Sequence, residues 1–165
     1  MTGASGDERT RPTLYVLTGL PGSGKSTHAA RLAAQTGAVH VAMDDAVVER
    51  GLSLVDYESR FALQPEVEAS IPPLLAAGKS VVAEFGSWAA EERARLRALA
   101  SPSGARTELH WVDAPVEVCI ERVLARGGEG AEGLARDVLG ASAHLYEKPD
   151  AKEQASFDAF VHVRT

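Results

Sequence analysis

The chain has 165 residues, a length that suits one domain, and 45% of them are apolar, which is enough for a buried core. The 17 basic and 23 acidic side chains give a net charge of −6, which weighs against a nucleic-acid-binding protein, whose surface is usually basic. The single cysteine, Cys119, excludes an intramolecular disulfide, and no apolar run reaches the roughly 20 residues of a membrane span. We therefore expect a cytoplasmic protein that binds neither membranes nor nucleic acid.

Residues 1–12 are polar and aperiodic and lack the apolar core of a signal peptide, so we expect a disordered tail before one domain at 13–165. Short apolar runs that suit buried parallel strands recur along this domain. Helical patterns fill most of the gaps, and this alternation predicts an α/β fold whose parallel sheet is covered on both faces. The apolar runs are residues 14–17, 39–43, 80–85, 109–112 and 160–163.

The predicted helices have glycine or proline at their boundaries, as helices commonly do. Pro72 and Pro73 should bend or interrupt the second helix. Glycine becomes frequent after the last helix, and we interpret residues 127–145 as either a mobile linker or a lid over a phosphate site. The helices are 26–36, 66–77, 89–100 and one that begins at Pro115, whose apolar face includes Cys119 as a core residue.

The residues between the first strand and the first helix match the complete P-loop motif G-x-x-x-x-G-K-[ST], in the context that the motif requires. Its glycines let backbone N–H groups turn inward around phosphate, and the helix N-terminus adds a positive field. Lys25 would reach the β- and γ-phosphates, Ser26 would offer its hydroxyl to Mg²⁺, and Thr27 would lie near the α-phosphate. The sequence therefore predicts an ATP–Mg²⁺ site formed by Gly19, Pro21, Gly22, Ser23, Gly24, Lys25, Ser26 and Thr27.

Carboxylates follow the second and third predicted strands, and ligands in parallel α/β sheets bind at these strand ends. Asp44 would lie beside the phosphates and could accept the proton of an attacking hydroxyl or contact the metal. Alternatively, Asp44 or Asp45 caps the next short helix, and we assign Asp45 mainly this role or an indirect one toward substrate. Glu84 interrupts an apolar run, so it requires a cation or hydrogen-bond donors, such as Lys25, a Mg²⁺-bound water or the substrate.

Several further side chains are candidates for the substrate site, although no motif identifies them. Trp88 either lines the pocket or packs in the core, and Ser87 is expected to cap the helix that follows. Residues 49–73 would build the acceptor pocket, with Tyr57, Arg60 and Phe61 as its candidates. No histidine shows the spacing of a metal site.

Arg122 and Arg126 share one face of the fourth helix and adjoin the glycine-rich segment, where an arginine could bind phosphate or stabilise the transition state. The alternative is that both are solvated. Arg136 is a weaker third candidate. We interpret Arg93, with Arg95 and Arg97, as part of a solvated surface that pairs with nearby glutamates.

These motifs resemble the small P-loop kinases of the nucleoside-monophosphate-kinase-like type. The sequence is more closely similar to the AAA-type ATP-binding kinases, which include relatives of chloramphenicol phosphotransferase, zeta toxin and polynucleotide 5′-hydroxyl kinase. The resemblance covers about 14–163 and is carried by the P-loop, by Met43-Asp44-Asp45, by residues 81–93, and by residues 109–115 with Arg122 and Arg126 downstream.

The resemblance implies a P-loop three-layer sandwich with a five-stranded sheet in the order 2-3-1-4-5, with Asp44 as the base and lid arginines on ATP. Two departures matter. Residues 46–48 lack the family arginine that often binds an anionic acceptor, which disfavours a phosphorylated acceptor, and Glu84 replaces an aspartate.

The motifs and the resemblance together assign the candidate roles. The catalytic candidates are Lys25, Asp44, Arg122 and Arg126; Arg122 and Arg126 are also nucleotide-binding candidates; the substrate candidates are Asp44, Asp45, Tyr57, Arg60, Glu84 and Trp88; and the metal candidates are Ser26 and Asp44.

The leading hypothesis is an ATP-dependent phosphotransferase that acts on a hydroxyl of a small molecule, such as an antibiotic or another natural product, as a monomer or homodimer. One alternative is a polynucleotide or nucleoside kinase, which would need a basic groove. Another is a nucleotide-dependent switch without a reactive base, and a further one is a toxin-type kinase of sugar nucleotides.

Overall fold

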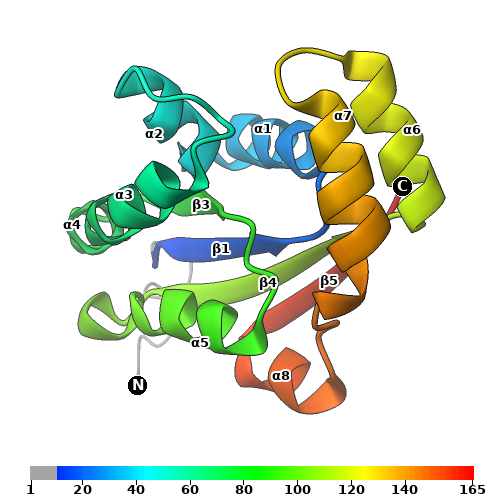
Figure 1. Ribbon diagram of the computed structural model, residues 1–165. Helices are drawn as coiled ribbons and strands as arrows, with labels where there is room; N and C mark the ends of the chain where they lie inside the picture. Colours follow the sequence, from blue (N-terminus) through cyan, green and yellow to red (C-terminus); the bar gives the residue numbers. More distant parts are fainter. Residues whose placement is uncertain (1–10) are drawn as a thin grey trace, which may run out of the picture.

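The computed structural model describes residues 11–165 and contains one sheet of five parallel strands in the order β2-β3-β1-β4-β5 (Figure 1). This confirms the α/β class, the P-loop fold and the predicted strand order. The expected tail at 1–12 lies, apart from its last two residues, outside the described part of the chain. The strands are β1 (Thr13–Thr18), β2 (Val39–Ala42), β3 (Val81–Glu84), β4 (Arg106–Asp113) and β5 (Ala159–Arg164).

Helices cover both faces of the sheet. On one face Ala29 of α1 packs with Leu17 and Val82, and on the other face Leu96 of α5 packs with the main core around Leu14. Figure 1 shows α1 on one side of the strands and α5 and α8 on the other. The α-helices are α1 (Lys25–Thr36), α2 (Met43–Glu49), α3 (Tyr57–Ala69), α4 (Ile71–Ala76), α5 (Ala90–Ala98), α6 (Val116–Arg126), α7 (Ala131–Gly133) and α8 (Ala151–Ser156).

The helix predicted at 66–77 is wrong at its start. Helix α3 begins at Tyr57 because the Asp56 side chain caps it, accepting a hydrogen bond from the Ser59 N–H at 3.1 Å. The expected interruption near the prolines is confirmed, since the helix breaks at Ser70 before Pro72 and Pro73 enter α4.

The glycine-rich segment at 127–145 is more ordered than a linker. It contains α7, the π-helix η2 (Leu134–Gly140) and the 3₁₀-helix η3 (Ala143–Leu145). Ala135 and Leu139 pack against Cys119 and Val123 of α6 in a separate small core. The prediction that Cys119 is a core residue is confirmed, because its side chain is fully buried.

Arg93 is completely buried, so its interpretation as a surface arginine is wrong. It lies one turn from Leu96 on the buried face of α5. The burial of its charge is possible because the charge has a partner inside the fold. Its Nε and Nη2 donate to the two carboxylate oxygens of Glu153 on α8, at 2.5 and 2.8 Å. The remaining N–H groups reach three carbonyls, those of Ser87 at 2.9 Å, Trp88 at 3.0 Å and Glu147 at 2.7 Å.

We expect Arg93→Ala to lower the free energy of unfolding by about 3–5 kcal/mol, because it leaves the Glu153 carboxylate and several carbonyls without a donor. Arg95→Ala, on the same helix, is the matched control. Arg95 is 49% exposed and pairs with Glu68 at 2.9 Å, so its loss should cost less than about 1 kcal/mol. Urea unfolding of both variants measures the difference, and equally small losses would contradict the anchoring role of Arg93.

Candidate active site

The P-loop, residues 19–26, connects β1 to α1 and is held so close to its neighbours that two of its glycines cannot be replaced. A Cβ on Gly22 would lie 2.5 Å from the carbonyl oxygen of Cys119, and Gly22 has a φ of 80°. A Cβ on Gly19 would lie 2.3 Å from the carbonyl oxygen of Val112. The loop is therefore packed against the end of β4 and the face of α6.

The N-terminus of α1 is open to an anion. Gly24 is the N-cap residue, no side chain caps the helix, and its first turn carries no acidic residue. The first N–H groups of the helix can therefore bind phosphate, as the motif predicts.

Lys25 folds back over the P-loop, where its Nζ donates to the carbonyl oxygens of Gly19 at 2.7 Å and Leu20 at 3.3 Å. Burial lowers the pKa of Lys25 to about 8, although the carboxylates of Glu84 and Asp44 act in the opposite direction. The charges of these two acids favour the protonated lysine, as expected for residues around one phosphate site.

Glu84, at the end of β3, receives the donors that its burial requires. Its Oε2 accepts a hydrogen bond from the Ser26 hydroxyl at 2.6 Å, and its Oε1 lies 2.8 Å from Nε2 of His40. Burial alone would raise the pKa of Glu84, but the hydrogen bonds from His40 and Ser26 outweigh it, and the pKa is lowered. Glu84 thus remains a carboxylate in contact with the serine expected to bind Mg²⁺.

His40 was missed by the sequence reasoning, although a signal existed. It interrupts the apolar β2 strand two residues before Ala42, which is paired in register with Glu84. Side chains two residues apart lie on the same face of a sheet, so His40 and Glu84 share a face on neighbouring strands. The hydrogen bond to Glu84 raises the pKa of His40.

Asp44 and Asp45 lie in the first turn of α2, directly after β2. The prediction that one of them caps this helix is wrong, because the N-cap residue is Ala42 and no side chain makes a capping bond. Asp44 instead forms an ion pair with Arg60 of α3, and both aspartates are exposed. Two expected site residues, one at the end of β2 and one within α3, are therefore brought into direct contact.

The loop after β3 places Trp88 against Tyr146, with ring centroids 6.1 Å apart and an interplanar angle of 79°. Ser87 does not cap α5, whose N-cap residue is Ala89. Its carbonyl instead accepts a hydrogen bond from the Thr18 hydroxyl at 2.7 Å. The Tyr146 hydroxyl lies 2.8 Å from the same threonine oxygen, and burial raises the pKa of Tyr146 to about 12, which keeps the phenol neutral.

The two arginines of α6 differ in their contacts. Arg122 donates from Nη1 to the carbonyls of Gly22 and Ser23, at 3.3 and 3.4 Å, and to the Thr165 hydroxyl at 2.9 Å. Thr165 in turn donates to the Ser23 carbonyl at 2.7 Å. Arg122 therefore braces the P-loop backbone, while Arg126 is exposed and makes no ion pair or hydrogen bond with other side chains in residues 11–165.

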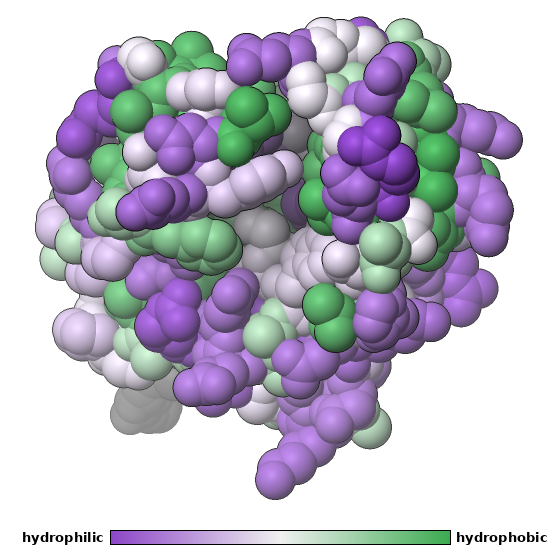
Figure 2. Space-filling model, in the orientation of Figure 1, coloured by the Kyte–Doolittle hydropathy of each residue, from purple (hydrophilic) through white to green (hydrophobic). Residues whose placement is uncertain are grey.

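The segment after α6 contacts the loop between α2 and α3. The Ser53 hydroxyl, between α2 and α3, donates to Glu129 at 3.1 Å, and Val55 lies against Gly130. Figure 2 shows this face hollowed between the part that contains α2 and α3 and the part that contains α6 and η2. Arg136 instead forms an ion pair with the neighbouring Asp137, at 2.9 Å, and both side chains are exposed.

Tyr57 and Phe61 flank Arg60 on α3 and are 48% and 66% exposed. No described contact connects either ring to the P-loop, so the structure brings only Arg60 of this group to a candidate catalytic residue.

A family model described as the AAA domain matches residues 14–149. The chain belongs to this family of P-loop kinases. Comparison with curated proteins finds no match. Within residues 11–165, no helix combines the length and the apolar character needed to span a bilayer.

Solved kinase structures share the fold. A sugar kinase from a Janibacter species is 20% identical, with a TM-score of 0.63, and the match covers 93% of this chain and 85% of that one. The APS kinase of Mycobacterium tuberculosis, solved with AMPPNP and APS, is 23% identical, with a TM-score of 0.62 over 92% and 88% of the two chains. A chain of the Pnkp1/Rnl/Hen1 complex is 30% identical, with a TM-score of 0.58, but the match covers 68% of this chain and only 39% of that one.

The lowered pKa of Lys25 predicts that nucleotide affinity falls as the pH rises through about 8. The free protein loses the lysine charge in this range, whereas bound phosphates hold the proton and raise the pKa. Binding of AMP-PNP at pH 8 should therefore take up about half a proton, and affinity should fall about tenfold per pH unit above that range. Calorimetry in buffers of different ionisation enthalpy measures this uptake. Lys25→Arg, with a permanent charge, should show none, and a constant affinity from pH 7 to 9 in the natural protein would contradict the assignment.

Proposed function

We propose that this P-loop kinase transfers the γ-phosphate of ATP to a hydroxyl group of a small molecule, with Asp44 as the general base. The observation that carries the proposal is the placement of two carboxylates at neighbouring strand ends beside the P-loop. Asp44 directly follows β2, and Glu84, the last residue of the adjacent strand β3, accepts a hydrogen bond from Ser26 of the P-loop. A carboxylate at that position can accept the proton of a hydroxyl that attacks the γ-phosphorus.

The residues have distinct proposed roles in this transfer. The acceptor oxygen bonds to the γ-phosphorus as its proton passes to Asp44, and the bond between the γ-phosphorus and the bridging oxygen of ADP breaks. Lys25 and the N–H groups at the start of α1 stabilise the charge on the phosphate oxygens. Arg60 holds the Asp44 side chain toward α3 through their ion pair.

The donor set is compatible with Mg²⁺ that is bound mainly through the nucleotide. No cluster of three or more His, Cys, Asp or Glu side chains in residues 11–165 could hold a metal alone. The Ser26 hydroxyl and the oxygens of Glu84 and Asp44 are hard ligands at the phosphate end of the sheet, and Mg²⁺ typically combines few protein ligands with phosphates and water. When bound, the ion would neutralise charge that develops on the phosphate oxygens.

We propose that residues 127–145 form a lid. The hydrogen bond between Ser53 and Glu129 and the contact between Val55 and Gly130 already connect this segment to the loop between α2 and α3. Arg126 stands at the base of the segment with no ionic partner in the described residues, so it is the α6 arginine best placed to take a phosphate. Arg122 would act through the P-loop backbone that it contacts, and Arg136 remains the weakest candidate.

A small-molecule acceptor, such as an antibiotic or another natural product, fits the charge of the protein better than a polynucleotide does. The net charge is −6, and the Asp44 carboxylate already neutralises the charge of Arg60. The sugar kinase, gluconokinase and shikimate kinase with the same fold are named for small acceptors. The similarity to the Pnkp1 complex supports a second candidate, a 5′-hydroxyl polynucleotide kinase.

Asp44→Asn should lower the rate of phosphoryl transfer by about 10²–10⁴-fold, because it removes the proton acceptor, while AMP-PNP still binds through the P-loop. Glu49→Gln, at the end of the same helix, is the control and should retain full activity. ADP release would be measured with hydroxylated antibiotics, sugars, nucleosides and a 5′-hydroxyl oligonucleotide. Stimulation by the oligonucleotide alone would favour the second candidate, and nucleotide binding without stimulation by any acceptor would favour a switch.

Gly130→Ala should lower kcat by about ten- to a hundredfold, because its methyl group would lie 2.3 Å from Cγ1 of Val55 and displace the proposed lid. Gly128→Ala is the matched control. Gly128 has a φ of 92°, and nothing lies within 4 Å of an added Cβ, so the substitution adds similar backbone strain without a contact. Steady-state kinetics of both variants would distinguish lid displacement from strain, and equal rates would contradict a role for the contact.

A further inference from the structure

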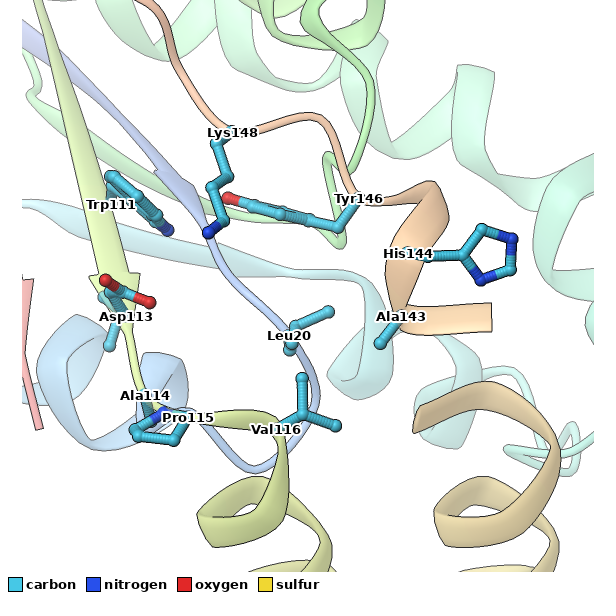
Figure 3. Close-up of a pocket in the computed structure, with 11 residues that line it drawn as sticks. Leu20, Trp111, Asp113, Ala114, Pro115, Val116, Ala143, His144, Tyr146 and Lys148 are labelled. Atoms are coloured by element: carbon cyan, nitrogen blue, oxygen red, sulfur yellow. The ribbon is translucent and has the colours of Figure 1, made fainter. Parts of the chain in front are cut away.

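A cavity of about 450 Å³ lies at the end of β4, on the side of the P-loop away from Asp44. This volume falls within the roughly 300–1,000 Å³ that small-molecule sites have. Its lining joins the end of β4 and the start of α6 to the segment that follows η2, as Figure 3 shows. The stretch 109–115 carries part of the family resemblance, but the sequence assigned no ligand to it.

The lining combines a fixed aromatic wall with one cation and one anion. The Trp111 indole stacks on His162, with centroids 4.2 Å apart and planes within 3°. His162 is held by Asp113, whose Oδ2 lies 2.9 Å from Nε2 of the histidine. In Figure 3 the Lys148 side chain passes the hydroxyl end of Tyr146 and ends on the side of Trp111, and Lys148 joins no ion pair of residues 11–165.

The cavity borders the γ-phosphate end of the nucleotide site. Leu20, the P-loop residue that lines it, is also a residue whose carbonyl accepts a hydrogen bond from Lys25. The P-loop lysine reaches the β- and γ-phosphates, whereas Thr27, expected near the α-phosphate, does not line the cavity. Its occupant would therefore lie beside the phosphate that is transferred, where an acceptor belongs.

The sheet order sets the distance between this cavity and the proposed base. Asp44 follows β2 and Asp113 ends β4, and the order β2-β3-β1-β4 separates these strands by three spacings. At about 4.8 Å each, these spacings amount to roughly 14 Å. A molecule that presents a hydroxyl to Asp44 and also occupies the cavity must therefore be elongated.

We propose that this cavity binds the distal part of the acceptor, an aromatic ring that carries a carboxylate and a hydrogen-bond donor. The ring lies against Trp111, the carboxylate pairs with Lys148, and the donor bonds to Asp113. The inference rests on the proposed function for the acceptor's identity as a substrate, but the binding site itself does not depend on catalysis. The proposal implies an acceptor that is larger than a simple sugar.

Anthranilate is a probe with the required ring, carboxylate and amino donor. The chain has two tryptophans, so Trp88→Phe leaves Trp111 as the only one. Bound anthranilate should quench Trp111 emission saturably through energy transfer and should bind more tightly than benzoate, which lacks the donor, or aniline, which lacks the carboxylate. The measurement requires no turnover, so it can succeed even if the proposed phosphotransfer fails.

Lys148→Met should weaken anthranilate binding about three- to fivefold, the value of an exposed ion pair, and should abolish the preference over aniline. Lys79→Met is the control, because Lys79 is exposed and precedes β3 at the opposite end of the sheet. Three outcomes would overturn the proposal: quenching that does not saturate, equal anthranilate affinity in the two lysine variants, or displacement of anthranilate by AMP-PNP, which would assign the cavity to the nucleotide.

Discussion

The guanidinium of Arg93 makes hydrogen bonds to separate parts of the chain from a position that solvent does not reach. It connects the loop after β3, through the Ser87 and Trp88 carbonyls, to the Glu147 carbonyl and to the carboxylate of Glu153. None of these groups could be buried without a partner, so the ion pair and its carbonyls form one interdependent unit. Because Arg93 bonds to the carbonyls of Trp88 and Glu147, this unit also positions the contact between Trp88 and Tyr146.

Two polar side chains of the nucleotide site, those of Lys25 and Ser26, have hydrogen-bond partners within the protein. Lys25 donates to carbonyls of its own loop, and the Ser26 hydroxyl donates to Glu84. Nucleotide binding therefore exchanges internal hydrogen bonds for bonds to phosphate and metal, and its net free energy is a difference between the two sets. This arrangement also explains why a lysine beside two carboxylates can have a lowered pKa, since burial outweighs their charges.

The parts of the fold that depend on local sequence could be predicted. The P-loop is continuous in sequence, and each strand of the buried sheet is a short apolar run, whereas the strand order came from the family resemblance. The ion pairs that shape the site join residues far apart in the chain, such as Arg93 with Glu153 and Asp44 with Arg60, and spacing carries no record of them. An arginine one turn from an apolar residue fits either a buried or an exposed face, so only its distant partner decides.

Arg122 and Thr165 also connect the P-loop to the edge strand β5. Thr165 follows the edge strand β5, pairs through its backbone N–H with the Asp113 carbonyl at 2.9 Å, and bonds through its hydroxyl to the Ser23 carbonyl. By thermodynamic linkage, a ligand that fixes the P-loop backbone must stabilise the docked state of this strand by the same free energy with which docking favours the ligand. The outermost strand of the sheet would then protect its amides most strongly when the nucleotide site is filled.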